Sequence, residues 1–108
     1  MTAQPSPSPS FIPNGHPDEP LFQLGTLVAT PGALALLREF ALAPIDFLIR
    51  HRHGDWGNLV EHDIEANRIA LRRSRRLLSS YDISADRKLW IITEADRSST
   101  TLLLPEEY

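Results

Sequence analysis

At 108 residues the chain has room for one small domain, and its net charge of -3 argues against nonspecific binding of nucleic acid by the whole chain. Since it contains no cysteine, disulfides, thiolate metal sites and cysteine nucleophiles are excluded. It also lacks a signal-peptide pattern and a run of about 18 apolar residues, so we expect a cytoplasmic protein that does not enter a membrane.

The first twenty residues differ in composition from the rest of the chain. Residues 1–20 hold six of the nine prolines and few large apolar side chains. Such a segment buries too little apolar surface to offset the entropy lost on ordering. We therefore predict a disordered arm over residues 1–20 and a single small α+β domain over residues 21–108.

Two helices are predicted after a short apolar lead-in at Leu24, Leu27 and Val28. Thr30 has the character of an N-cap and Pro31 suits the first helical position, so the spacing of the apolar residues predicts a helix from about Pro31 to Ala41. Pro44 can begin a second helix, which continues through IDFLIRH and ends at Gly54.

The segment RHRHGDWGN, residues 50–58, is predicted to join the second helix to a third. Its two glycines favour a turn because glycine reaches positive φ without strain. Asn58 or Asp55 can cap the third helix, which runs through NLVEHDIEANRIALRRS. The apolar residues of this helix are compatible with one buried stripe: Leu59, Ile64, Ala66, Ile69 and Leu71.

From Arg76 onward the pattern is that of β-strands. The segments RLLSSYDIS, RKLWIITEAD and STTLLLPEEY are rich in Leu, Ile, Thr, Tyr and Trp, and short polar turns separate them. Short connections favour antiparallel neighbours, since parallel strands need a crossover. The sequence thus predicts a C-terminal three-stranded antiparallel meander with the helices covering one face.

The segments RHRHGDWG, IEANRIAL, RLLSSY and LWIITEADRSSTTLLLPEEY carry a resemblance. Together they resemble a family of small uncharacterised proteins encoded on proteobacterial plasmids and integrative elements. The resemblance covers about Pro44 to Tyr108, and its most specific part is ITEADRSSTTLLLPEEY. It implies a bacterial mobile-element setting and supplies no activity.

A second resemblance is architectural and suggests catalysis. A helical segment that ends in histidine, followed by a meander, is similar in order to ribonucleases of the barnase and RelE-like type. The resemblance implies His51 or His53 as general acid or base, and Arg97 with Thr100 or Thr101 on the phosphate. Each residue also has an ordinary structural explanation: the histidines suit a helix C-terminus, the threonines suit strands, and Arg97 can pair with a nearby acid.

Other residues are candidates for binding. A metal site at His51 and His53 would need a further ligand from Asp55, His62 or Asp63. No standard metal-binding signature is present, so we predict no metal and no cofactor. Trp56, between two glycines, is either a lid over the helix junction or an exposed contact residue. The candidate binding residues also include four arginines and an aspartate: Arg52, Arg72, Arg73, Arg76 and Asp55.

Two functions remain open at this point. The first is an accessory protein of a mobile element that acts by protein-protein interaction, plausibly by inhibiting a host defence system such as restriction or CRISPR. The second is a small metal-independent ribonuclease of the toxin type, whose partner would be RNA. The relative positions of His51 and Arg97 discriminate between them, because catalysis needs both groups at one phosphate. The sequence does not indicate the partner or the oligomeric state.

Overall fold

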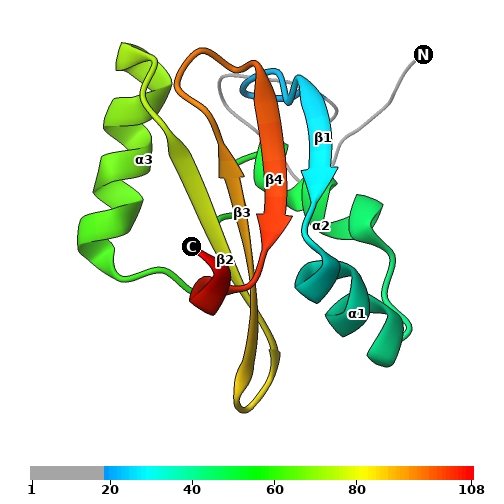
Figure 1. Cartoon of the computed structure of the whole chain (residues 1–108). Helices are drawn as coiled ribbons and strands as arrows, with labels where there is room; N and C mark the ends of the chain where they lie inside the picture. Colours follow the sequence, from blue (N-terminus) through cyan, green and yellow to red (C-terminus); the bar gives the residue numbers. More distant parts are fainter. Residues whose placement is uncertain (1–18) are drawn as a thin grey trace, which may run out of the picture.

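The chain is described by a computed structural model, which places residues 19–108. The elements, in chain order, are β1 (Thr26–Ala29), α1 (Pro31–Glu39), α2 (Pro44–Arg52), α3 (Glu61–Arg73), β2 (Leu77–Ser84), β3 (Arg87–Thr93), β4 (Ser99–Leu103) and the 3-10 turn η1 (Pro105–Glu107) (Figure 1). The predicted disordered arm lies outside the described residues except for its last two. Among the described residues, no helix is long and apolar enough to cross a membrane.

The four strands form one mixed sheet in the order β1-β4-β3-β2 (Figure 1). Strands β2, β3 and β4 pair antiparallel, as predicted, while β1 lies parallel to β4 with Thr26 opposite Ser99 and Ala29 opposite Leu102. The α+β class and the three helices are confirmed, but the prediction of a three-stranded antiparallel sheet is wrong. The apolar lead-in is the missing strand. Its partner lies about seventy residues away, so no local turn signal marks the pairing.

The first two helices begin where the sequence predicts. Thr30 accepts a hydrogen bond from the backbone N–H of Ala33 at its Oγ1 atom, over 3.1 Å, and Pro31 occupies the first turn. Helix α2 likewise has Pro44 in its first turn, where the missing N–H leaves no bond unmade. Local side-chain chemistry therefore sets both helix starts.

The predicted cap of α3 is wrong. Val60 is the N-cap residue, and it makes no side-chain cap bond. Asp55 instead forms an ion pair with Arg50, and Asn58 donates to the carboxylate of Asp82 over 2.9 Å. Both side chains bond to partners outside the helix, and the helix starts at Glu61, three residues after Asn58.

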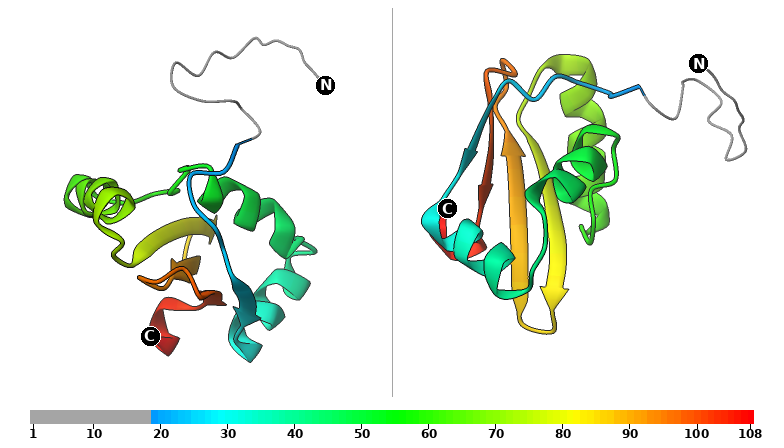
Figure 2. Two further views of the ribbon diagram at one scale, coloured as in Figure 1. Left: turned by 90° about the horizontal axis from the view of Figure 1, so that it is seen from above. Right: turned by 90° about the vertical axis from the view of Figure 1, so that its right-hand side faces the viewer.

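All three helices pack on one face of the sheet. The main core cluster joins α1 and α2 to β2, β3 and β4 through Ala33, Leu36, Leu37, Phe47, Leu48, Tyr81, Leu89, Ile91 and Leu102. A second cluster joins α3 to β2 through Phe22, Ala70 and Leu77. Figure 2 shows α2 and α3 on one side of the sheet and η1 on the other.

Helix α3 does not bury the stripe that was predicted. Asn67 and Ala70 are buried, whereas Ile64, Ile69 and Leu71 are half-buried and Ala66 is exposed. The Asn67 side chain donates to the carbonyl of Leu78 over 2.7 Å and accepts from the Leu78 N–H over 3.1 Å. A polar residue that bonds strand β2 therefore occupies the centre of the contact, which apolar spacing cannot reveal.

The opposite face of the sheet carries the C-terminal turn and, beside β2, the segment before α3, and we call it the open face. Its residues Ser80, Ile92 and Leu103 are buried. By the strand register its residues are Leu78, Ser80, Asp82, Lys88, Trp90, Ile92, Thr101 and Leu103. Tyr108 packs edge-on against Trp90, with ring centroids 5.9 Å apart. Half-buried side chains on this face, Trp90 among them, are accessible from solvent.

We expect Asn67→Ala to lower the free energy of unfolding by about 2–3 kcal/mol, because it leaves the N–H and the C=O of Leu78 without partners. The matched control is Asn58→Ala, which removes one exposed hydrogen bond and should change stability by less than about 1 kcal/mol. Urea unfolding of both variants measures the difference. Equal midpoints would contradict the role of Asn67.

Candidate functional site

A chain of hydrogen bonds crosses the core and centres on His51. The His51 Nδ1 atom lies 2.6 Å from the Ser79 hydroxyl, and its Nε2 atom lies 2.9 Å from the Thr93 hydroxyl. Thr93 is 2.7 Å from the hydroxyl of Thr100, which donates to the carbonyl of Leu24 over 2.7 Å. All four side chains are buried. The chain thus links α2, β2, β3, β4 and the segment before β1.

The direction of these bonds fixes the form of the imidazole. A carbonyl oxygen can only accept, so the Thr100 hydroxyl donates its one hydrogen to the carbonyl of Leu24. Toward Thr93 the Thr100 hydroxyl must therefore accept. Thr93 then accepts from Nε2–H of His51, and the remaining ring nitrogen, Nδ1, accepts from Ser79. Every polar atom is satisfied when His51 is neutral and protonated at Nε2.

Burial keeps this histidine neutral. His51 is fully buried, and removal from water lowers its pKa from the ordinary value of 6.5 to about 3. A second proton on the ring would also displace the hydrogen that Ser79 donates. His51 therefore does not act as a proton carrier near neutral pH, and the Ser79 hydroxyl bonded to it is equally buried.

Two aromatic rings close over the imidazole. The ring of Phe22 meets that of His51 edge-on at 5.1 Å, and Trp56 does so at 5.8 Å. The Phe22 and Trp56 rings stack on each other with centroids 6.2 Å apart. Trp56 is half-buried, and these ring contacts are those of a lid over the helix junction, while its role as a contact residue stays a prediction.

The junction loop is held by its own side chains. Arg50 binds both carboxylate oxygens of Asp55, at 2.7 and 3.3 Å, and this contact lowers the pKa of Asp55. The Asp55 carboxylate also accepts from the N–H of Gly57, and its backbone carbonyl accepts from the Tyr81 hydroxyl over 2.6 Å. Asp55 is thus bonded within the loop and to β2, while its side chain stays exposed.

The loop also extends the sheet at β2. The N–H of Ser80 donates to the carbonyl of Trp56 over 3.0 Å, and the Ser80 carbonyl accepts from the N–H of Asn58 over 2.7 Å. Gly57 lies between these bonds at φ +76°, and a Cβ there would overlap the Ser80 carbonyl. Only glycine allows this approach, so Gly57 is required by the tertiary pairing as well as by the turn.

Arg97 is bound by backbone carbonyls. Its guanidinium donates to the carbonyls of Arg75, Ala95 and Ala70 at 2.7, 3.0 and 2.9 Å. These bonds tie the turn between β3 and β4 to the C-terminal end of α3, where carbonyls lack helical partners. Burial lowers the pKa of Arg97, and its cation lies 5.7 Å from the centre of the Phe22 ring.

The four residues predicted as catalytic do not meet at one accessible position. His51 and Arg97 both contact Phe22, so they lie on the same face of the sheet with that ring between them. Thr101 lies on the open face, away from His51. His53 is half-buried, and its Nδ1 atom is 2.8 Å from the carbonyl of Ile49. The ribonuclease assignment stays a prediction without support from this geometry.

The predicted binding arginines have different surroundings. Arg52 is half-buried, and its Nε atom has no hydrogen-bond partner. Arg72 and Arg73 are exposed and make no ion pair within residues 19–108. Arg76 contacts Glu94 at 3.3 Å and donates to the hydroxyl of Tyr108. Arg76 therefore lies between the exposed arginines at the end of α3, Arg72 and Arg73, and Tyr108 on the open face.

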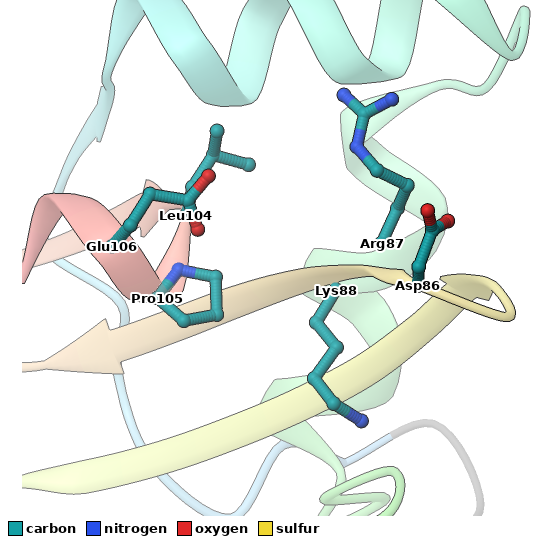
Figure 3. A pocket seen from close by; sticks show the side chains of 6 residues that line it. All are labelled: Asp86, Arg87, Lys88, Leu104, Pro105 and Glu106. Atoms are coloured by element: carbon teal, nitrogen blue, oxygen red, sulfur yellow. The ribbon is translucent and has the colours of Figure 1, made fainter.

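Two hollows lie near the start of β3. One, of about 390 Å³, is a groove on the open face lined by Asn58, Leu59, Val60, Asp63, Leu78, Ser80, Lys88 and Trp90. The other, of about 160 Å³, lies between the β2–β3 hairpin and η1 (Figure 3). Figure 3 shows Arg87 and Lys88 pointing away from each other there, so the second hollow has no convergent charges. In residues 19–108 no three acids or histidines are grouped as metal ligands.

Sequence reasoning missed several residues of the buried chain. Ser79 and Thr93 were not singled out, although both occupy inward-facing positions of alternating strands. Polar residues at such positions are the available signal, because they need a buried partner. No pattern in the sequence marked Phe22, which covers His51.

Comparisons with protein-family models, with curated proteins and with solved structures find no match to this chain. The fold and the site are therefore interpreted from the geometry of the chain alone. The mobile-element family and the ribonuclease architecture remain resemblances in sequence pattern.

Gly57→Ala should lower the free energy of unfolding by about 3 kcal/mol or more, because it adds backbone overlap to the strain of a positive φ. Gly54→Ala is the matched control. It also has positive φ, at +86°, but its Cβ would meet only the end of the Leu21 side chain, so about 1–2 kcal/mol is expected. Thermal or urea unfolding compares the two, and a smaller effect at position 57 would contradict the close pairing.

Stability should fall on mild acidification because of His51. The unfolded chain binds a proton near pH 6.5 while the folded chain does so only near pH 3, so protons favour unfolding throughout this interval. The free energy of unfolding should drop by about 1.4 kcal/mol for each pH unit below 6.5. The interval from pH 6.5 to 5 is diagnostic, since carboxylates remain ionised there.

The measurement is urea unfolding at several pH values with the wild type and two variants. His51→Gln should lose the dependence on pH in this interval and be less stable throughout. His62→Gln, at an exposed position on α3, should keep the wild-type slope. The same slope in His51→Gln and in the wild type would show that another group is responsible.

Proposed function

We propose that this chain is a noncatalytic binding protein of a mobile genetic element, which inhibits a host defence protein of the restriction or CRISPR type. The setting comes from the mobile-element resemblance of residues 44–108. The observation that carries the binding role is the open face of the sheet, where aromatic and arginine side chains gather on a surface that no described helix covers.

The candidate catalytic groups support binding over catalysis by the bonds they already make. His51 is neutral, fully buried and bonded at both nitrogens. Arg97 is occupied by backbone carbonyls. A general acid or base must reach its substrate, and a phosphate ligand must have free donors. His51 does not meet the first condition, and Arg97 already uses its Nη1 atom and one Nη2 donor on backbone carbonyls.

The open face has the composition of an interface centre. Trp90 and Tyr108 meet edge-on, and the cation of Arg76 lies 5.8 Å from the centre of the Tyr108 ring. Tyr108 is 71% exposed. Tryptophan, tyrosine and arginine dominate the energetics of protein interfaces because they offer large apolar area together with directed polar groups. The apolar groove beside Trp90 provides a recess for a side chain of the partner.

Charge indicates the chemistry of the partner surface. Arg72, Arg73 and Arg75 are exposed at the end of α3 and form no ion pair within the described part of the chain. Like charges held together favour an oppositely charged surface. The partner is therefore a protein with an acidic patch. RNA is a less suitable partner, because the molecule carries a net charge of -3 and because the acidic Asp82 lies on the open face.

Phage or plasmid transfer into a bacterium with an active restriction system, and into one with an active CRISPR system, tests the proposal. Expression of the chain should raise transfer in at least one of the two hosts. The double variant Arg72→Glu, Arg73→Glu should reduce this increase in transfer at least tenfold, because the chain would bind its acidic partner more weakly. Arg38→Glu is the matched control, since Arg38 is another exposed helical arginine without an ion pair among residues 19–108.

If expression of the chain does not raise transfer in either host, although soluble protein is confirmed in the cells, the proposal is contradicted. Cleavage of labelled cellular RNA by the pure protein with excess chelator would favour the ribonuclease alternative. That activity would have to disappear in His53→Ala or Arg97→Ala while their circular dichroism spectra stay unchanged. His51→Ala is less informative for this purpose because it also opens the core.

A further inference from the structure

Strand β1 is an edge of the sheet, so half of the N–H and C=O groups of this strand point away from β4. The N–H groups of Thr26 and Thr30 donate toward β4, to Ser98 and Leu102, at 2.9 and 3.0 Å. Because alternate residues of a strand point to opposite sides, the N–H groups of Leu27 and Ala29 point outward. An additional strand would find these donors in place.

The side chains at this edge are apolar and exposed. Leu27 is 51% and Val28 is 45% exposed. No charged residue occurs anywhere between Pro20 and Leu37, although about a quarter of the whole chain is charged. Edge strands of monomeric proteins are usually protected by being short, by lysine or proline, by a bulge or by a covering element. Strand β1, TLVA, is short at four residues, but it has no charge, proline or bulge.

We propose that β1 pairs antiparallel with β1 of a second copy of this chain, about a two-fold axis at Val28. In that register Leu27 lies opposite Ala29 of the second copy, and each such pair exchanges both backbone hydrogen bonds. Val28 meets its own equivalent across the axis, so an exposed apolar side chain is buried in both copies. The pairing uses every outward N–H of the strand.

Self-complementarity favours a second copy over the strand of another protein. The same three residues, Leu27, Val28 and Ala29, supply both sides of the pairing, and the uncharged segment offers no repulsion between identical surfaces. It also offers no charge by which a foreign strand would be selected. The axis is perpendicular to the sheet, so the two sheets become continuous and both open faces lie on the same side.

Sedimentation velocity of the full chain over a range of concentrations tests the association. The strand is short, so we expect a weak dimer whose fraction rises with concentration. Leu27→Lys should raise the dissociation constant at least tenfold. Ile45→Lys is the matched control, since Ile45 on α2 is 53% exposed, and it should leave the constant unchanged. A third variant, Leu27→Pro, removes an outward donor without breaking a bond to β4 and should also prevent association.

Amide hydrogen exchange on the wild type gives a second readout that needs no variant. The N–H groups of Leu27 and Ala29 should exchange slowly at high concentration and rapidly at low concentration. Those of Thr26 and Thr30 should be protected at both, because they bond β4. A monomer at all concentrations, protection of Leu27 that is independent of concentration, or a dimer lost in Ile45→Lys and kept in Leu27→Lys would each overturn the proposal.

Discussion

The buried imidazole of His51 is the constraint on which the arrangement of this domain depends. It is the point where helix α2 is bonded to strands β2 and β3, and through Thr93 and Thr100 to β4 and the segment before β1. A neutral ring with two satisfied nitrogens is tolerated in the core, whereas a charged or unbonded ring would be costly. The elements must therefore meet in one register to satisfy it.

The same constraint explains why the region richest in reactive side chains supplies structure. The junction loop closes the core over His51 with Trp56 and Phe22, and Arg50, Asp55 and Gly57 hold the loop in place. Arg97 performs a similar task at the end of α3. Residues that would be catalytic at an accessible surface are here bonded to one another or to the backbone. The surfaces that packing leaves free are therefore the ones on which we propose that the protein binds.

Those surfaces follow from the layer architecture. Three helices on one face of a four-stranded sheet leave the other face and the β1 edge uncovered by any described helix. The open face carries Trp90, Tyr108 and Arg76, while the edge carries Leu27 and Val28. One surface combines aromatic rings with positive charge, and the other is apolar and without charge. We propose different partners for them, an acidic protein surface for the open face and a second copy of the chain for the edge.

The sequence by itself determined those features whose cause is local. Pro31 and Pro44 mark helix starts because proline fits the first turn, and the alternation of β2, β3 and β4 with short turns dictates their antiparallel pairing. The tertiary structure alone decided the rest. Strand β1 exists through pairing with a strand about seventy residues away, and His51 is a core residue because Ser79 and Thr93 lie beside it. Contacts between distant segments leave no period or spacing in the sequence, so neither the fourth strand nor the burial of this histidine was predictable from it.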